Sequence, residues 1–200
     1  MFWNCELGTG NFFSEVALTN ETAASQEMRV VFGIEQIQQR IREVARQLAT
    51  DYRGKTVYAV CVLEDGFIFM GDLVRHLDVP VTCQFIKPEL QQLRSGATTE
   101  IFFSPEVDVK GGDVLLVQGM VDTGITSEFL MRNLVGRGAA SVRLACLLDR
   151  QNARRIQLQP DYYCFQIDDR FVFGYGLGSP QLNRNLPHVA TRGNNSSERK

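Results

Sequence analysis

The sequence lacks long apolar stretches and an excess of charge of either sign. No apolar run approaches the roughly 18 residues that a membrane-spanning helix requires. Lys and Arg together number 21 and Asp and Glu 23, which gives a net charge of −2. A chain with this balance has no excess of basic residues to attract nucleic acid or an anionic membrane, so we expect neither as a partner.

Histidine is scarce and cysteine is scattered, which argues against several kinds of site. Neither His76 nor His188 stands at ligand spacing from a Cys or carboxylate cluster, and the five cysteines include no Cys-x-x-Cys pair. We therefore expect no metal site, and buried reduced thiols instead of a disulfide framework. A Gly-x-Ser-x-Gly elbow, which a Ser-His-Asp hydrolase requires, is also absent. No signal-peptide pattern opens the sequence, so we expect a cytoplasmic location.

The length of 200 residues and the apolar fraction of 44% fit one globular domain with short appendages. Residues 190–200 are polar, and we expect a disordered tail there. Residues 29–189 would form the domain. Residues 1–28 show no hydrophobic period, which predicts a partly ordered extension whose aromatic residues dock on the domain or on a partner: Phe2, Trp3, Phe12 and Phe13.

Strand-like and helix-like segments alternate through residues 28–175. Apolar residues at helical spacing predict helices at 34–48, 66–76 and 127–135. Apolar runs rich in Val, Ile, Leu and aromatic residues predict strands at 28–32, 56–63, 79–86, 101–103, 113–117, 141–148, 162–167 and 171–175. Residues 94–99 are polar and contain a glycine, so we expect a loop there. This alternation predicts an α/β fold with a mostly parallel sheet flanked by helices.

One strand-to-helix transition, residues 118–127, carries the strongest chemical signal. An apolar strand runs into Asp122-Thr-Gly-Ile-Thr126, and a predicted helix follows. Backbone N–H groups at such a glycine-containing turn converge on one point and bind phosphate well. Asp and Thr are also common before a helix for capping alone, with no ligand involved. The spacing alone leaves both interpretations open.

The turn also resembles the phosphoribosyl-pyrophosphate (PRPP) signature of type I phosphoribosyltransferases. The similarity extends over about residues 29–189, in the order and spacing of the hypoxanthine/guanine branch. The segments that carry it are Val31-Phe-Gly-Ile-Glu-Gln-Ile37, Val62-Leu-Glu-Asp-Gly-Phe-Ile-Phe-Met70, Leu147-Leu-Asp-Arg150, Pro160-Asp-Tyr162, Phe171-Val-Phe-Gly-Tyr-Gly-Leu177 and Arg184-Asn-Leu-Pro187. This resemblance implies a type I phosphoribosyltransferase fold with a small hood region built from the chain ends.

The resemblance further implies a reaction and the residues that carry it. Members convert a 6-oxopurine and PRPP to a nucleoside 5′-monophosphate and pyrophosphate with Mg²⁺, and they form dimers or tetramers. Asp122 would be the proton-handling carboxylate beside the purine. The 5′-phosphate would lie on Asp122, Thr123, Gly124, Ile125 and Thr126. The purine would contact Arg150, in place of a family Lys, together with Phe171 and Val172, and Arg184 would face pyrophosphate.

The sequence departs from the family pattern at the reacting centre. Gln118 and Gly119 replace two acidic residues that hold the ribose hydroxyls and Mg²⁺, and Gly178 replaces a further acid. Amide and glycine positions are poor ligands for a hard cation. In the pyrophosphate loop, Glu64 and Asp65 replace a Lys-Gly pair and reverse its charge. Two alternatives stay open for this pair: both side chains point outward, or they hold a metal from the opposite side.

The loop of residues 93–99 contains Ser95 but lacks the Tyr of the family's lid, so we expect poor closure over the site. The departures together predict a purine-salvage phosphoribosyltransferase whose activity is weak or lost. The alternative is a non-catalytic paralogue that binds a nucleoside 5′-monophosphate or another phosphate as a regulator or partner subunit. A third possibility is an interaction module that uses the aromatic N-terminus.

Overall fold

The computed structural model describes residues 28–192 apart from 64, 94–95, 104–106 and 179–181. The N-terminal extension of residues 1–27, Glu64 and residues 193–200 therefore lie outside the described residues. Among the described residues, no helix is both long and apolar enough to cross a membrane.

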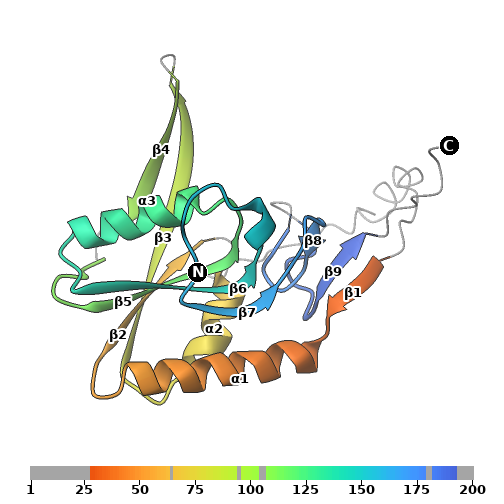
Figure 1. The fold of residues 1–200 in the computed structure, drawn as a ribbon, viewed down its shortest axis with the longest axis horizontal. Helices are drawn as coiled ribbons and strands as arrows, with labels where there is room; N and C mark the ends of the chain where they lie inside the picture. Colours follow the sequence, from red (N-terminus) through yellow and green to blue (C-terminus); the bar gives the residue numbers. More distant parts are fainter. Residues whose placement is uncertain (1–27, 64, 94–95, 104–106, 179–181, 193–200) are drawn as a thin grey trace, which may run out of the picture.

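A six-stranded sheet forms the centre of the domain, in the order β4-β3-β2-β5-β6-β7 (Figure 1). Every pairing in it is parallel except that of β3 with β4. The strands are β2 (Val57–Val62), β3 (Val81–Leu93), β4 (Gly96–Phe103), β5 (Asp113–Val121), β6 (Ser141–Asp149) and β7 (Tyr162–Gln166). The predicted α/β architecture with a mostly parallel sheet is confirmed.

Helices cover both faces of this sheet, as the alternation of its buried residues requires. In β5, Leu115 and Val117 belong to the core cluster that includes α1 (Ile34–Asp51) and α2 (Phe67–Val74). Val114 and Leu116 face the opposite cluster, which includes α3 (Ile125–Gly136). Successive strand residues point to opposite faces, so a strand that is apolar throughout is buried only when both faces are covered.

A smaller antiparallel sheet joins the two ends of the described chain beside the main sheet (Figure 1). It has the order β1-β9-β8, with β1 at Met28–Phe32, β8 at Val172–Phe173 and β9 at Val189–Arg192. This is the hood that the resemblance implied. The expected tail boundary is wrong by three residues, because residues 190–192 pair with β1 within β9.

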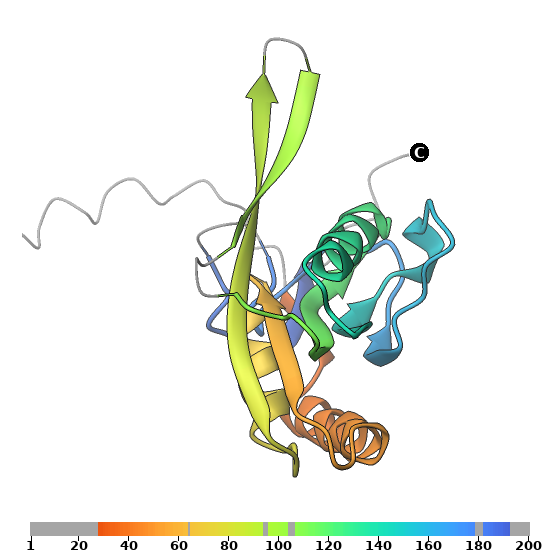
Figure 2. The same ribbon diagram turned by 90° about the vertical axis from the view of Figure 1, so that its left-hand side faces the viewer.

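The predicted loop at residues 94–99 is also wrong. β3 continues to Leu93, and β4 returns from Gly96, so that the two strands form a long hairpin, which projects from the body of the domain (Figure 2). Residues 94–95 lie outside the described residues. The β-branched and aromatic residues of 98–103 favour strand, and antiparallel pairing with β3 outweighs the local turn signal of Gly96. The expected lid segment is therefore mostly strand.

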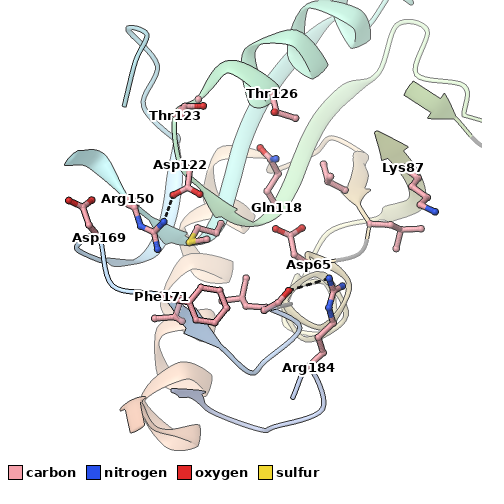
Figure 3. A pocket seen from close by; sticks show the side chains of 17 residues that line it. Asp65, Lys87, Gln118, Asp122, Thr123, Thr126, Arg150, Asp169, Phe171 and Arg184 are labelled. Carbon is pink, nitrogen blue, oxygen red and sulfur yellow. Dashed lines mark hydrogen bonds and ion pairs between the residues drawn. The ribbon is translucent and has the colours of Figure 1, made fainter. Parts of the chain in front are cut away.

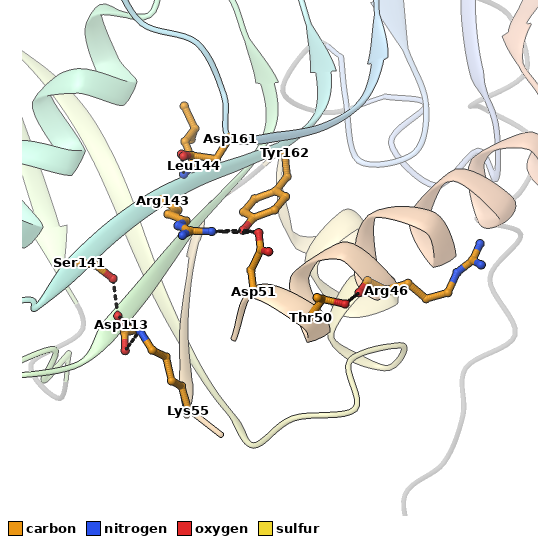
Figure 4. A network of polar contacts seen from close by, with 10 residues as sticks. All are labelled: Arg46, Thr50, Asp51, Lys55, Asp113, Ser141, Arg143, Leu144, Asp161 and Tyr162. Carbon is orange, nitrogen blue, oxygen red and sulfur yellow. Dashed lines mark hydrogen bonds and ion pairs between the residues drawn. The ribbon is translucent and has the colours of Figure 1, made fainter. Parts of the chain in front are cut away.

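Polar contacts fasten the edge of the sheet where β5 and β6 begin (Figure 4). Asp113 accepts hydrogen bonds from Ser141 and from Lys55, and these contacts lower the pKa of its carboxyl. Tyr162 and Arg143 both donate to Asp51, at 2.7 and 3.0 Å, and thereby tie the end of α1 to the sheet. These contacts lie at the N-terminal ends of the strands, opposite the edge at which parallel α/β sheets bind ligands.

The cysteines differ partly from expectation. Cys61, Cys146 and Cys164 are buried and free, and burial raises the pKa of the Cys61 thiol to about 12. Cys83 of β3 is free but exposed, as are its neighbours Thr82 and Phe85. Within the described residues, no three His, Cys, Asp or Glu side chains lie close enough together to hold a metal ion.

Candidate functional site

A cavity of about 680 Å³ lies where β2, β5 and β6 end (Figure 3). Its walls come from the segments that follow these strands, from the residues around β8 and from Arg184. This is the edge at which doubly wound sheets bind ligands, because strand ends and helix starts converge there. Most of the site residues predicted from the sequence line this one cavity, although they are up to 119 positions apart in the chain (Asp65 to Arg184).

The Asp122–Thr126 turn joins β5 to α3. Gly124 has φ +83°, in the left-handed region where a side chain is strained, and no side-chain cap hydrogen bond is made at this residue, the N-cap of α3. The one local side-chain contact is a 3.4 Å hydrogen bond from the Ile125 N–H to Thr123 Oγ1. Asp122, Thr123, Gly124 and Thr126 line the cavity, whereas Ile125 does not, so the start of α3 borders the cavity at the place where helix N-termini bind anions.

A buried arginine supports the turn from behind, and sequence reasoning missed it. Arg154 donates a 2.8 Å hydrogen bond to the backbone oxygen of Asp122 and forms an ion pair with Asp149. The two side chains are only 9% and 6% exposed. The Arg155 N–H also donates to the Thr123 oxygen at 3.0 Å. The residues after β6 thus fix the backbone path of the Asp122–Thr126 turn.

Asp122 and Arg150, which were predicted for the catalytic and purine positions, form an ion pair of 2.8 Å. Arg150 also donates to the backbone oxygens of Asp168 and Arg170, at 3.0 and 2.8 Å. Its guanidinium therefore bridges the Asp122–Thr126 turn and the loop that precedes β8.

Phe171 and its neighbours form the end of the cavity that was predicted to hold the purine base. Phe171 is 59% exposed, which excludes simple core packing for this ring, and its centroid lies 6.4 Å from that of Phe173. An exposed ring on a cavity wall is available for stacking on a flat ligand. Val172, by contrast, is buried within β8. Asp169 also lines this end, and no sequence signal distinguished it from a surface residue.

Two of the three residues predicted for the pyrophosphate side, Asp65 and Arg184, line the cavity, whereas Glu64 lies outside the described residues. Asp65 lines the cavity, and Figure 3 shows it between Gln118 and Arg184. Its carboxylate accepts hydrogen bonds from the backbone N–H groups of Gly119 and Met120, while burial raises its pKa. Arg184 lines the same wall and donates to the Gly178 oxygen at 3.4 Å. Lys87 of β3 adds a second cation that sequence reasoning did not identify.

The positions where the family carries acids offer little to a divalent cation. Gln118 is buried, and its Oε1 accepts a 2.6 Å hydrogen bond from Ser127, so this oxygen is engaged within the protein. Gly119 has no space for a side chain, because a Cβ there would lie 2.5 Å from the Asp65 backbone oxygen. Gly178 is equally closed, with φ +118° and a Cβ that would lie 2.9 Å from the Phe173 Cβ. This donor set does not fit a resident Mg²⁺.

Comparison with known proteins agrees with this arrangement. The phosphoribosyl transferase domain family matches residues 32–180. Hypoxanthine-guanine phosphoribosyltransferase of Streptococcus pneumoniae is 34% identical over 163 residues, which cover 80% of this chain and 91% of that protein. The corresponding protein of Streptococcus thermophilus is 31% identical over 163 residues, which again cover 80% of this chain and 91% of that protein.

Solved structures show the same fold. A hypoxanthine phosphoribosyltransferase from Staphylococcus aureus superposes with a TM-score of 0.77 at 30% identity, and the match covers 82% of this chain and 91% of that one. A hypoxanthine phosphoribosyltransferase variant from Trypanosoma cruzi, solved as a ternary substrates complex, gives a TM-score of 0.76 at 31% identity. The match covers 82% of this chain and 95% of that one.

Proposed function

The chain belongs to the phosphoribosyltransferase family, in its hypoxanthine-guanine branch, and from this premise we propose that it binds a purine nucleoside 5′-monophosphate while its transferase activity is weak or lost. The substrates of the full reaction would be a 6-oxopurine and PRPP with Mg²⁺. A homo-oligomeric assembly and a cytoplasmic location belong to the same proposal and rest on the resemblance.

One observation supports the proposal: the Asp122–Thr126 turn, called the phosphate turn from here on, has no side-chain cap hydrogen bond at Gly124, while Gln118 and Gly119 of β5 supply no carboxylate beside it. The turn at Gly124 presents the N-terminus of α3, but Gln118 is tied to Ser127 and position 119 is closed by the loop backbone. A monophosphate needs only the turn. PRPP also brings a pyrophosphate, whose departure needs its developing charge to be neutralised.

Electrostatics on the pyrophosphate side points in the same direction. At an effective dielectric near 20, a carboxylate about 5 Å from a phosphate charge costs on the order of 3 kcal/mol, and solvent at the open side reduces this figure. Asp65 provides such a carboxylate, while Lys87 and Arg184 offset part of the repulsion. The balance is less favourable to a polyanion than to a single phosphate held at the turn.

The test combines binding with turnover. Calorimetry with inosine and guanosine 5′-monophosphates should show saturable binding below millimolar ligand. A coupled assay with hypoxanthine, guanine or xanthine, PRPP and Mg²⁺ should give turnover at least about 100-fold below that of the Streptococcus pneumoniae relative, which is the usual cost of losing one group that stabilises the transition state. Comparable turnover would contradict the proposed loss of activity.

The runner-up is a purely non-catalytic nucleotide-binding paralogue, and the Asp122–Arg150 ion pair favours it because it occupies the proton-handling carboxylate. Under this alternative, calorimetry detects the monophosphates, but no nucleotide forms even at high protein concentration. Absence of binding at millimolar monophosphate would contradict both versions.

A further inference from the structure

Asp65 lies on the cavity wall between the phosphate turn and Arg184, and the close approach of its loop to β5 fixes the position of its side chain. The Asp65 backbone oxygen sits against two glycines, since a Cβ at Gly119 or Gly176 would lie 2.5 or 2.8 Å from it. No other residue type would let the loop approach β5 and the β8 segment so closely. This approach brings the Asp65 carboxylate to the N–H groups of Gly119 and Met120.

The anchored carboxylate retains capacity for a ligand. An ionised carboxyl group has about four acceptor positions, and the backbone N–H groups of Gly119, Met120 and Asp65 itself use part of them. The remaining positions face a cavity whose phosphate turn and exposed Phe171 would fix the two ends of a nucleotide. Two neighbouring hydroxyl groups are the donors that match such a carboxylate, and the sugar of a ribonucleotide supplies them between phosphate and base.

A divalent cation fits the same carboxylate less well. Arg184 lies close enough to stabilise the charged form of Asp65, and its positive charge opposes a second cation. Within the described residues, no group of three acidic, His or Cys side chains surrounds the position. Hydroxyl donors carry no net charge and meet no such opposition.

We propose that Asp65 is a specificity-determining residue that accepts hydrogen bonds from the 2′- and 3′-hydroxyls of a ribonucleoside 5′-monophosphate, without a divalent cation. The phosphate of this ligand lies on the Asp122–Thr126 turn. The inference rests on the proposed nucleotide binding and adds the sugar selectivity of that site. It assigns to the loop a role that Gln118 and Gly119 of β5 cannot fill.

The experiment measures dissociation constants by calorimetry for guanosine, 2′-deoxyguanosine and 3′-deoxyguanosine 5′-monophosphates, in EDTA and in Mg²⁺. The wild-type chain should bind the ribonucleotide at least about 10-fold more tightly than either deoxynucleotide, as expected for hydrogen bonds to a charged group. The ratio should be equal in EDTA and in Mg²⁺. Asp65→Asn should reduce it to about 2-fold or less.

Asp169→Asn is the matched control, since it removes one carboxylate from the base end of the same cavity. It should change the affinity for all three nucleotides by a common factor and leave the ratio unchanged. If Asp65→Asn does not fold, the wild-type series still tests the two parts of the inference that need no variant, the preference for the ribonucleotide and its independence of Mg²⁺.

Equal affinity for ribo- and deoxynucleotides in the wild-type chain would overturn the inference and leave the proposed nucleotide binding intact. Selectivity that appears only with Mg²⁺ would also overturn it, by making Asp65 a metal ligand. Failure of all three nucleotides to bind would reject the proposed function itself.

Discussion

Gly119→Ala is expected to destabilise the fold, because the new Cβ has no space. It would lie 2.5 Å from the Asp65 oxygen, 2.8 Å from the Asp65 carbonyl carbon and 2.8 Å from Leu177 Cδ2. Two of these three atoms belong to backbone, and backbone does not rotate away. The Asp65 oxygen also lies 2.8 Å from a hypothetical Cβ on Gly176, so the loop has little room to retreat.

The magnitude follows from the overpacking that this contact causes. Inserting one carbon into a closely packed site costs about 1–3 kcal/mol. The Asp65 backbone lies between Gly119 and Gly176 and cannot move away, so we expect the cost of Gly119→Ala to lie in the upper half of that range. A chain of 150–250 residues loses about 2–4 °C of melting temperature per kcal/mol, so we expect a decrease of about 4–12 °C.

Differential scanning calorimetry measures this decrease, and Gly71→Ala is its matched control. Gly71 lies in α2, and a Cβ there meets no atom within 4 Å. Alanine in an exposed helix interior stabilises by about 1 kcal/mol relative to glycine, so the control should melt slightly higher. Equal melting temperatures for the two variants would refute the steric argument and reopen position 119 to a side chain.

Three further predictions concern the same site. Arg154→Met leaves the Asp149 carboxylate buried without its partner, which should lower the free energy of unfolding by about 3–5 kcal/mol. The melting temperature should then fall by about 6–20 °C, and a decrease of only about 2 °C would show that the ion pair is not buried. Gly124→Ala puts a side chain at φ +83°, which costs about 1–2 kcal/mol, and thermal-shift assays should show weaker stabilisation by inorganic phosphate; undiminished stabilisation would argue against the turn as the phosphate site. Burial raises the pKa of Asp65 above 3.8, so the folded state loses stability as the pH rises from 3.8 through the raised pKa. The stability gain of Asp65→Asn over the wild-type chain should accordingly be larger at neutral pH than below 3.8, and chemical denaturation that shows the same gain at both would contradict this.

Most of the order of elements, and the strand–turn–helix transition at residues 118–127, could be predicted from residue patterns alone. Hydrophobic period located α1, and the apolar run of 113–117 located β5, because these signals are local. The turn at Asp122–Thr126 was found from its glycine and its position between a strand and a helix. The hairpin of β3 and β4 could not be found in this way, since pairing across the sheet overrides the local turn signal of residues 94–99.

The position of Asp65 on the cavity wall depends on tertiary contacts. The sequence determined that β5 lacks carboxylates at Gln118 and Gly119 and that the loop carries Asp65. Only the folded chain decided that the Asp65 carboxylate lies inside the cavity on the β5 backbone, because its path depends on glycines at 119 and 176, far from it in sequence. Local patterns report which groups a chain contains, whereas the direction of a half-buried side chain is fixed by the atoms that surround it from distant segments.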